Sequence, residues 1–496
     1  MSEQQPLDTA RHIRYWQRCF RSVLPHHYVT NDSIRLTLGF FIVAALDLLS
    51  SPSSYSEPPR DPLKASLITP DDRKRLRAWV LSLQHPQGGF CGSPHHVLPK
   101  KYTTKWDSVN KIESAGDPAN ANIAATYFAL LLLGILADDD GSRAFQGICR
   151  IKTLRWLKTL QREDGSFGEI IDEDGYVAGG KDMRYCYLAA TIRWALGGAE
   201  AGEDINVDAL VAHIRRGQTF DGGLGESSTH ESHAGYVYCA VAALSLLDLA
   251  NPNAATEPDR YLHAGIPSIP SLVHFLACRQ FDYHEPETDD DAEESVNHPL
   301  PDLSTLDLSD APQLAGFNGR LNKVADTCYT WWVTGTLSML GEGGVVDRDP
   351  ARNFILAKTQ HLIGGFAKHP GGPPDVYHAY LGLAALGTLS LESEEKETGL
   401  GKFDPRLCIG VEASGRVAKA REALLAPPED DDESDDGWAL KMEEIKKSLN
   451  LDKIQEQNAK LEAMWRAEGK IPLVEMSKWN PLHPPNIDDL INGKTS

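Results

Sequence analysis

Leu160-Gln161-Arg162-Glu163-Asp164-Gly165-Ser166-Phe167-Gly168 is one copy of a turn that occurs five times in the chain. The other copies contain Gln84, Gln218, Gln280 and Gln360. In each copy a helical pattern runs into a glutamine, and glycine followed by a large apolar residue comes after it. Glycine permits the positive φ of a tight turn, and the apolar residue anchors that turn on the core. Five copies of one helix–turn–helix unit predict a helical array.

The segments between these turns have apolar residues at helical spacing, and none has the alternation of a strand. Thr69-Pro70-Asp71-Asp72 is a helix start, with a capping hydroxyl, proline at the first position and acids in the first turn. The other expected helices span roughly 11–24, 33–50, 121–137, 147–160, 183–197, 206–216, 234–250, 268–280, 324–340, 351–362, 376–391 and 404–426. The predicted fold class is therefore all-α.

Two acidic runs interrupt the repeats. Residues 285–294 and 429–436 carry seven acids each and no base, and they account for fourteen charges of the net −21. Such runs are usually solvated segments. We predict a repeat core at 1–426 with an acidic surface-loop insert at 282–315. The remaining residues, 427–496, are interpreted as an acidic linker, a charged helix near 438–468 and a proline-containing tail.

The composition also excludes several classes of function. An acidic protein is a poor partner for the phosphates of nucleic acid. The eight cysteines are scattered without a Cys-x-x-Cys pair, which favours a reducing compartment. The N-terminus lacks the apolar core of a signal peptide, and the longest apolar run, 123–137, is too short for a bilayer span of ~20 residues. We expect a cytoplasmic protein without a membrane span.

Asp326, Cys328 and His378 form a candidate zinc site. All three are ordinary zinc ligands, and three protein ligands leave a fourth position open, as in catalytic sites. Arg320 and Lys323 are three residues apart and are expected on one helical face, where cations oppose the helix dipole unless an anion binds them. A thiol-accepting metal beside an anion-binding pair suggests transfer of a group from a phosphate ester to sulfur. In the alternative interpretation, Cys328 and His378 are core residues and the two cations are solvated.

The repeats, Asp326-Thr327-Cys328-Tyr329 and the downstream His378 resemble the β subunits of protein prenyltransferases over residues 10–425. The resemblance implies an α-α toroid, a six-hairpin helical barrel that pairs with an α subunit. Residues 11–19 and 33–41 resemble the geranylgeranyltransferase type I branch of the family. That branch implies transfer of geranylgeranyl from geranylgeranyl diphosphate to the cysteine of C-terminal CaaX motifs, mostly CaaL, of Rho/Rac-type small GTPases.

Matching residue by residue, the resemblance implies roles for individual side chains. Asp326, Cys328 and His378 would hold one Zn²⁺ per β subunit, and the substrate cysteine would occupy the fourth position as a thiolate. The residues expected to bind the diphosphate are His233, Arg320, Lys323, Tyr329 and Lys368. Those expected to line the isoprenoid channel are Thr37, Tyr127, Arg184, Tyr187, Tyr236, Cys239 and Trp332. Phe41 and Tyr377 are expected to contact the CaaX peptide.

Two positions separate the geranylgeranyl branch from the farnesyltransferases. Lys368 stands where farnesyltransferase β subunits have an aspartate that recruits Mg²⁺, so no Mg²⁺ requirement is expected. Thr37 stands where they have a bulky tryptophan, which leaves space for a fourth isoprene unit. Tyr377 instead resembles the farnesyltransferases, because the animal type I enzyme is expected to have leucine, and Ala234 replaces a usual glycine.

Three alternative functions remain at this point. They are a farnesyltransferase β subunit, a helical scaffold without catalysis, and a terpene cyclase. A scaffold gives no reason for the three metal-ligand residues to fall on motif positions. A cyclase has no use for them, and its acidic motif would match Asp289-Asp290-Asp291 only superficially.

Overall fold

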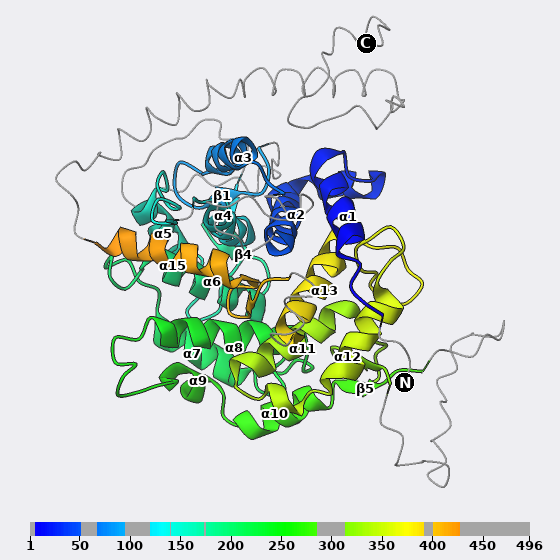
Figure 1. Cartoon of the computed structure of the whole chain (residues 1–496). Helices are drawn as coiled ribbons and strands as arrows, with labels where there is room; N and C mark the ends of the chain where they lie inside the picture. Colours follow the sequence, from blue (N-terminus) through cyan, green and yellow to red (C-terminus); the bar gives the residue numbers. More distant parts are fainter. Residues whose placement is uncertain are drawn as a thin grey trace, which may run out of the picture.

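The computed structural model describes residues 5–50, 67–94, 120–138, 140–172, 175–284, 313–390 and 400–426. Its centre is a ring of inner helices, in which each helix packs on the next and the last packs on the first. The ring consists of α2 (Arg35–Leu49), α4 (Ile123–Ile135), α6 (Met183–Leu196), α8 (Ala234–Leu249), α11 (Thr327–Met339) and α13 (Val376–Leu389). Figure 1 shows these helices around a common centre. The predicted α-α toroid is confirmed.

A second set of helices lies outside the ring, one before each inner helix. These are α1 (Thr9–Arg21), α3 (Pro70–Ser82), α5 (Arg150–Thr159), α7 (Val207–Arg216), α10 (Ile269–Ala277) and α12 (Arg348–Phe354). The additional helices are η1 (His26–Ile34), α9 (Arg260–Gly265), η4 (Gly343–Val345), η5 (Ile355–Thr359) and α15 (Val411–Leu425). α9 packs between α7 and α8, and α15 packs across α4 and α6.

The sequence shows no alternating strand pattern, yet the all-α fold contains a few very short strands. The strands are β1 (Phe90–Cys91), β2 (Ala121–Asn122), β3 (Ile170–Ile171), β4 (Val177–Ala178), β5 (Gln280–Asp282), β6 (Ala315–Phe317), β7 (Phe403–Asp404) and β8 (Ile409–Gly410). They pair in sequence order as four antiparallel two-stranded sheets. Segments of two or three residues are too short to show an alternating pattern. For the same reason the helix expected from residue 404 begins only at Val411, after β7 and β8.

The repeat glutamines connect successive repeats. In each copy the side-chain oxygen accepts a hydrogen bond from the backbone N–H of the residue that precedes the next outer helix. The five pairs are Gln84 with Cys149, Gln161 with Asn206, Gln218 with Ser268, Gln280 with Asp347 and Gln360 with Asp8. An N–H at a helix start has no partner within its helix, and the glutamine supplies one. Because Gln360 contacts the first helix of the chain, this last bond closes the ring.

The apolar residue of each turn has the role that the sequence predicts, and glycine has a positive φ in four of the five copies, the exception being the copy with Gly316. Gly165 has φ 86°, and a Cβ there would lie 1.9 Å from the carbonyl oxygen of Ala209 at the start of α7. The turn therefore requires glycine both for its conformation and for its close approach to the next helix. The apolar residues of the five turns, which are Phe90, Phe167, Leu224, Phe317 and Phe366, are fully buried.

A segment near the end of the repeat core, residues 403–410, crosses the interior of the ring and is here called the strap. Four inner helices have tyrosine as their fifth residue, and each tyrosine hydroxyl donates a hydrogen bond to a carbonyl oxygen of the strap. The pairs are Tyr127 with Leu407, Tyr187 with Arg406, Tyr238 with Pro405 and Tyr380 with Cys408. These bonds satisfy the strap's buried carbonyl groups. The strap therefore closes the barrel on one side of the tyrosine layer.

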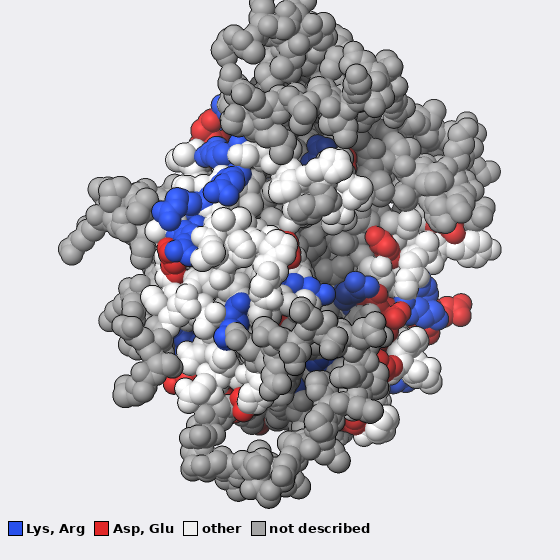
Figure 2. All heavy atoms as spheres, turned by 90° about the vertical axis from the view of Figure 1, so that its right-hand side faces the viewer, with Lys and Arg blue, Asp and Glu red and all other residues white. Residues whose placement is uncertain are grey.

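Residues 427–496 and most of the predicted acidic insert, 285–312, lie outside the described residues, so the domain division remains a prediction. The insert is bounded by β5 and β6, which pair with each other. On the face in Figure 2, basic and acidic side chains of the described part occur together, although the whole chain is strongly acidic. Within the described residues, no helix combines the length and apolar composition that crossing a bilayer requires.

Candidate metal and diphosphate site

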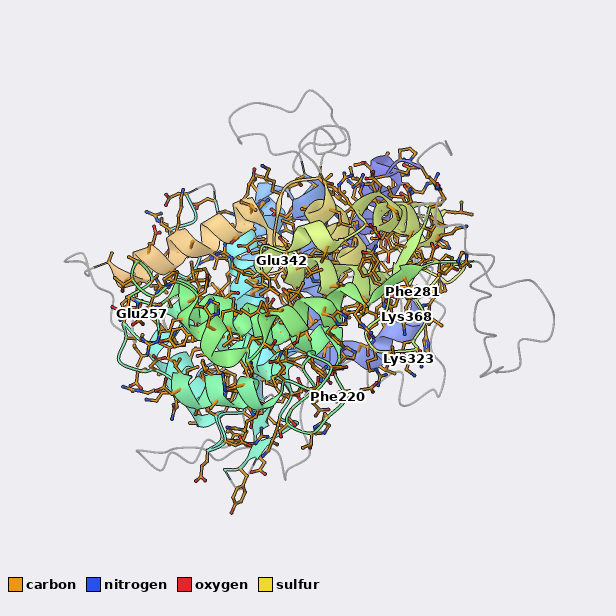
Figure 3. All side chains as sticks on the ribbon, turned by 90° about the horizontal axis from the view of Figure 1, so that it is seen from below. Phe220, Glu257, Phe281, Lys323, Glu342 and Lys368 are labelled. Atoms are coloured by element: carbon orange, nitrogen blue, oxygen red, sulfur yellow. The ribbon has the colours of Figure 1, made fainter. Side chains whose placement is uncertain are left out.

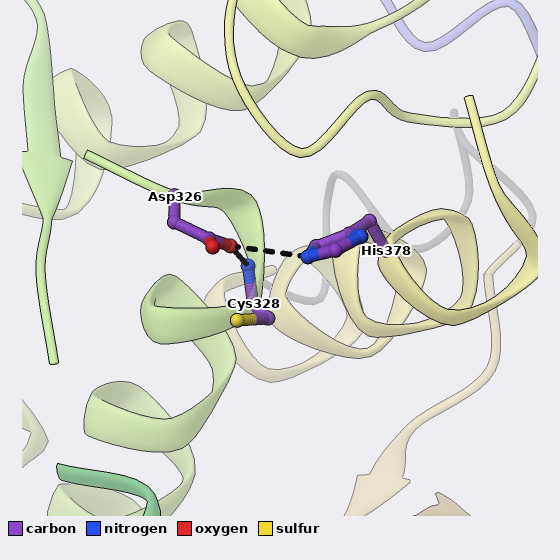
Figure 4. A group of neighbouring side chains, drawn as sticks. All are labelled: Asp326, Cys328 and His378. Carbon is purple, nitrogen blue, oxygen red and sulfur yellow. Dashed lines mark hydrogen bonds and ion pairs between the residues drawn. The ribbon is translucent and has the colours of Figure 1, made fainter. Parts of the chain in front are cut away.

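Asp326, Cys328 and His378 come together at the first turns of two neighbouring inner helices (Figure 4). Asp326 caps α11, and its Oδ1 accepts the backbone N–H of Cys328 at 2.8 Å. His378 lies in the first turn of α13, with Nε2 3.4 Å from Oδ1 of Asp326. One ligand atom from each residue lies within 4.8 Å of the others. The structure thus brings together all three predicted metal ligands.

The protonation of these groups depends on their burial and on one another. Burial opposes the charge on His378, but hydrogen bonds and charges from Asp326 and Asp375 outweigh it and raise the pKa of His378 to about 9. Burial would raise the pKa of Asp326, yet hydrogen bonds from His378 and Cys328 lower it. Burial, followed by the charge of Asp326, raises the pKa of the Cys328 thiol well above its usual range. Without a metal, the thiol stays protonated at neutral pH.

Asp375 supports the site, and sequence reasoning missed it. Its Oδ2 lies 2.6 Å from Nδ1 of His378, while its Oδ1 caps α13 by accepting the N–H groups of Tyr377 and His378. This carboxylate fixes the ring so that Nε2 faces Asp326. Metal-binding histidines commonly have such a carboxylate on the second nitrogen. The available signal was position, because Asp375 occupies the same capping place before α13 that Asp326 occupies before α11.

A second group of predicted residues meets at the start of α8. His233 caps that helix, and its Nδ1 accepts the N–H of Gly235, so the proton lies on Nε2, which is 2.9 Å from the hydroxyl of Tyr329. Burial, and then the charge of Arg320, lowers the pKa of His233 to about 4. Arg320 itself pairs with Glu231 at 3.1 Å. At neutral pH, His233 is therefore an uncharged donor to Tyr329.

The expectation that Arg320 and Lys323 share a helical face was wrong. α11 begins only at Thr327, and both cations lie in the irregular segment before it, where Asn322 has φ 58°. The side-chain amide of Asn318 holds this segment by donating to the carbonyl of Lys323 at 2.9 Å. Lys323 and Lys368 lie on the same side of the molecule in Figure 3. Arg320 and Lys323 are thus presented by an irregular segment rather than by a helix.

The inner wall of the barrel carries a continuous set of aromatic rings. Phe41 of α2 contacts Tyr377 and Phe128, with ring centroids 5.7 and 5.8 Å apart. The contacts continue from Tyr127 to Tyr187 at 5.3 Å, from Tyr187 to Tyr238 at 5.6 Å, and from Tyr238 to Trp332 at 4.8 Å. Phe128, Tyr238 and Tyr380 are members of this wall that sequence reasoning missed. Their shared place early in each inner helix was the available signal.

The remaining predicted residues also lie on inner helices. Cys239 of α8 is buried, and Tyr236 is partly buried with its ring 5.0 Å from that of His233. Arg184 of α6 makes a two-point ion pair with Asp182, the capping residue of its own helix. Thr37 is partly buried in the first turn of α2, one turn before Phe41. The predicted site residues therefore all belong to the inner ring or to the loops at its entrance.

The fold and the site can now be compared with known proteins. Residues 7–409 match the model of the prenyltransferase α-α toroid domain, and the chain belongs to that family. Its relatives include the geranylgeranyl transferase type-1 subunit β of Arabidopsis thaliana, 28% identical over 416 residues that cover 80% of this chain and 87% of the relative. The protein farnesyltransferase subunit β of Schizosaccharomyces pombe is 24% identical over 402 residues, covering 79% of this chain and 80% of the relative.

Among solved structures, the chain resembles the Candida albicans protein geranylgeranyltransferase-I complexed with GGPP. The TM-score is 0.61 at 25% sequence identity, and the match covers 84% of this chain and 99% of that one.

Proposed function

We propose that the chain is the catalytic β subunit of a zinc-dependent protein geranylgeranyltransferase type I. The reaction transfers geranylgeranyl from its diphosphate to the cysteine of a C-terminal CaaX motif, mostly CaaL, of Rho/Rac-type small GTPases. The observation that carries the proposal is the Asp326, Cys328 and His378 cluster at the mouth of a toroid with an aromatic inner wall. Relatives and a solved structure of the same type support it.

The donor set fits zinc. A carboxylate, a thiol and an imidazole within 4.8 Å of one another match the ligand types of a three-ligand catalytic site. Asp375 orients the imidazole for this role by binding the opposite ring nitrogen. When bound there, zinc would lower the pKa of the substrate cysteine and hold it as a thiolate, which is the nucleophile of the reaction.

The residues around this cluster would act on the diphosphate. Because His233 donates to the hydroxyl of Tyr329, the hydroxyl proton of Tyr329 is free to point at a diphosphate oxygen. Arg320, Lys323 and Lys368 would neutralise the charge that develops as the carbon–oxygen bond breaks, and such electrostatic stabilisation is usually the largest catalytic contribution. A fixed ammonium at Lys368 would take the place of a metal ion there, so we propose that Mg²⁺ is not required.

The aromatic wall would bind the isoprenoid and exclude water from the reacting carbon. Each Å² of isoprenoid surface buried against this wall would contribute about 25 cal/mol to binding. We propose that Tyr127, Tyr187, Cys239 and Trp332 line this channel, with Tyr236 and Arg184 nearer its mouth. Phe41 and Tyr377, whose rings are in contact, would meet the side chains of the CaaX peptide.

The proposal includes a heterodimer with a prenyltransferase α subunit and a cytoplasmic location. The eight cysteines support a reducing compartment, since none of them is disulfide-bonded.

The main alternative is a farnesyltransferase β subunit, and two farnesyltransferase β subunits are among the relatives. Thr37 and Lys368 favour the geranylgeranyl enzyme over it.

Co-expression with α subunits of the family tests the proposal. The heterodimer is assayed with geranylgeranyl and farnesyl diphosphate against peptides ending in Cys-a-a-Leu or Cys-a-a-Ser, without added Mg²⁺. We expect geranylgeranyl transfer to the leucine peptide to have the highest kcat/KM. Preferential farnesyl transfer would identify the alternative enzyme, and a heterodimer without zinc or transfer would indicate a scaffold.

A further inference from the structure

Lys368, which is predicted to bind the diphosphate, also contacts the metal-ligand cluster. Its ammonium nitrogen lies 3.8 Å from Oδ2 of Asp326. The other oxygen of that carboxylate, Oδ1, faces Nε2 of His378 and accepts the N–H of Cys328. The two oxygens of the Asp326 carboxylate thus have different partners: Oδ1 faces the other metal ligands and Oδ2 faces Lys368.

Hydrogen bonds hold the backbone around Lys368 beside Asp326. The carbonyl of Lys368 accepts the N–H of Thr327 at 3.0 Å, and the carbonyl of Ala367 accepts the hydroxyl of Thr327 at 2.6 Å. On the other flank, Nδ1 of His369 lies 2.7 Å from the carbonyl of Ala325. Residues 367–369 are therefore bound to residues 325–327 on both sides of Asp326.

The other cations of the site lack this contact. Arg320 pairs with Glu231 on the rim of α8. Lys323 makes no ion pair within the part of the chain that the structure describes, although it faces the same side of the molecule as Lys368 (Figure 3). Lys323 is therefore a matched control, a second lysine predicted to bind the diphosphate that makes no ion pair with a metal ligand within the described residues.

We propose that Lys368 is a positioning residue of the metal site, which couples metal binding to diphosphate binding through the carboxylate of Asp326. The inference rests on the proposed function. A metal cation and the ammonium of Lys368 share one carboxylate and repel each other. A bound diphosphate neutralises the ammonium, and the metal then binds more tightly. By thermodynamic reciprocity, the metal increases the affinity for the diphosphate by the same factor.

The expected size of the coupling follows from the exposure of Lys368. Its side chain is 54% exposed, so water and salt screen much of the repulsion. Coupling between two sites is typically 5–150-fold. For a half-exposed ammonium we expect the lower end of this range, roughly five- to ten-fold.

The test measures the zinc dissociation constant of the heterodimer by competition with a chelator, with and without saturating geranylgeranyl diphosphate. In the wild type, the diphosphate should lower the zinc Kd roughly five- to ten-fold. In Lys368→Gln, the zinc Kd should already be low without the diphosphate and should no longer respond to it. Lys368→Arg keeps the charge and should retain the coupling. Lys323→Gln should bind the diphosphate more weakly but keep the wild-type coupling at saturation.

The outcomes separate this inference from the proposed function. If the heterodimer binds stoichiometric zinc but Lys368→Gln keeps the wild-type coupling, or Lys323→Gln loses it equally, the inference is wrong and the proposed function stands. If no stoichiometric zinc is bound, both are wrong. Thermal melting of each variant on the same preparation excludes a general loss of folding as the cause.

Discussion

Replacing Thr37 with tryptophan should change the preferred length of the isoprenoid. Thr37 lies in the first turn of α2, on the same helical face as Phe41, whose ring belongs to the aromatic inner wall. Its side chain is only partly buried, and we expect its accessible side to face the space that the isoprenoid would fill. A tryptophan at this position would extend into that space and exclude the last isoprene unit of a geranylgeranyl chain.

The magnitude follows from apolar burial. A five-carbon unit contributes about 4 kcal/mol at about 0.8 kcal/mol per buried carbon. If the tryptophan displaces the unit completely, all of this binding free energy is lost. If the site instead repacks around both groups, overpacking costs about 1–3 kcal/mol. Each 1.4 kcal/mol corresponds to about ten-fold in affinity. The ratio of kcat/KM for the two diphosphates should therefore move toward farnesyl by roughly ten-fold to a thousand-fold.

The assay compares both diphosphates at limiting concentration with one CaaL peptide, using wild-type and Thr37→Trp heterodimers. Zinc content and melting temperature, measured on the same preparations, should be unchanged. If a folded, zinc-loaded variant keeps the wild-type preference, Thr37 does not border the end of the isoprenoid channel. The choice between the two enzymes would then rest on Lys368 alone.

Three further predictions concern single residues. Lys368→Asp should make transfer respond to millimolar Mg²⁺, because a carboxylate replaces a fixed cation with a metal ligand; a rate that ignores Mg²⁺ would contradict this role. Asp375→Asn should weaken zinc binding roughly 10–100-fold, as loss of the partner of a ligand histidine usually does, and a chelator titration with the wild-type Kd would refute it. The third concerns His12, whose Nε2 contacts Gln360 and whose Nδ1 accepts the N–H of Gly365. Burial lowers the pKa of His12 from 6.5 to about 4, so the folded state prefers the neutral ring. The stability that this preference contributes is complete above pH 6.5 and is lost as the pH falls toward 4. The free energy of unfolding should fall by up to about 3 kcal/mol over that range, and His12→Gln should flatten this pH dependence in denaturant titrations; an unchanged slope would contradict it.

The repeat predicted a helical array, and the resemblance to the prenyltransferases implied that this array is a toroid and that Asp326, Cys328 and His378 would bind a metal. A recurring turn locates each inner helix, and the residues just after the turn lie at the mouth of the barrel. Asp326, Cys328 and His378 occupy such places, so their proximity could be expected although the third lies fifty residues after Cys328. The repeat also contained a signal that was not used. Tyrosine or tryptophan is the fifth residue of five inner helices, which identifies the layer that binds the strap.

Other features could not be predicted because they depend on contacts between distant backbone groups. The strap is held by hydroxyl groups of four helices, and nothing in residues 403–410 alone indicates that position. The pairing of Gln360 with Asp8 joins the two ends of the repeat core across more than three hundred residues. The loop conformation of Arg320 and Lys323 was mistaken for helix because their spacing also fits a helical face. Their position is determined by Asn318 and by the late start of α11.

The central claim is that Asp326, Cys328 and His378 hold a catalytic zinc for geranylgeranyl transfer. The most direct measurement determines, on one preparation of the heterodimer, the zinc content and the rate of geranylgeranyl transfer to a CaaL peptide, for the wild type and for Cys328→Ala. The account predicts one zinc per wild-type heterodimer, and loss of both the zinc and the transfer in a variant that remains folded. Transfer at the wild-type rate by metal-depleted Cys328→Ala would contradict it.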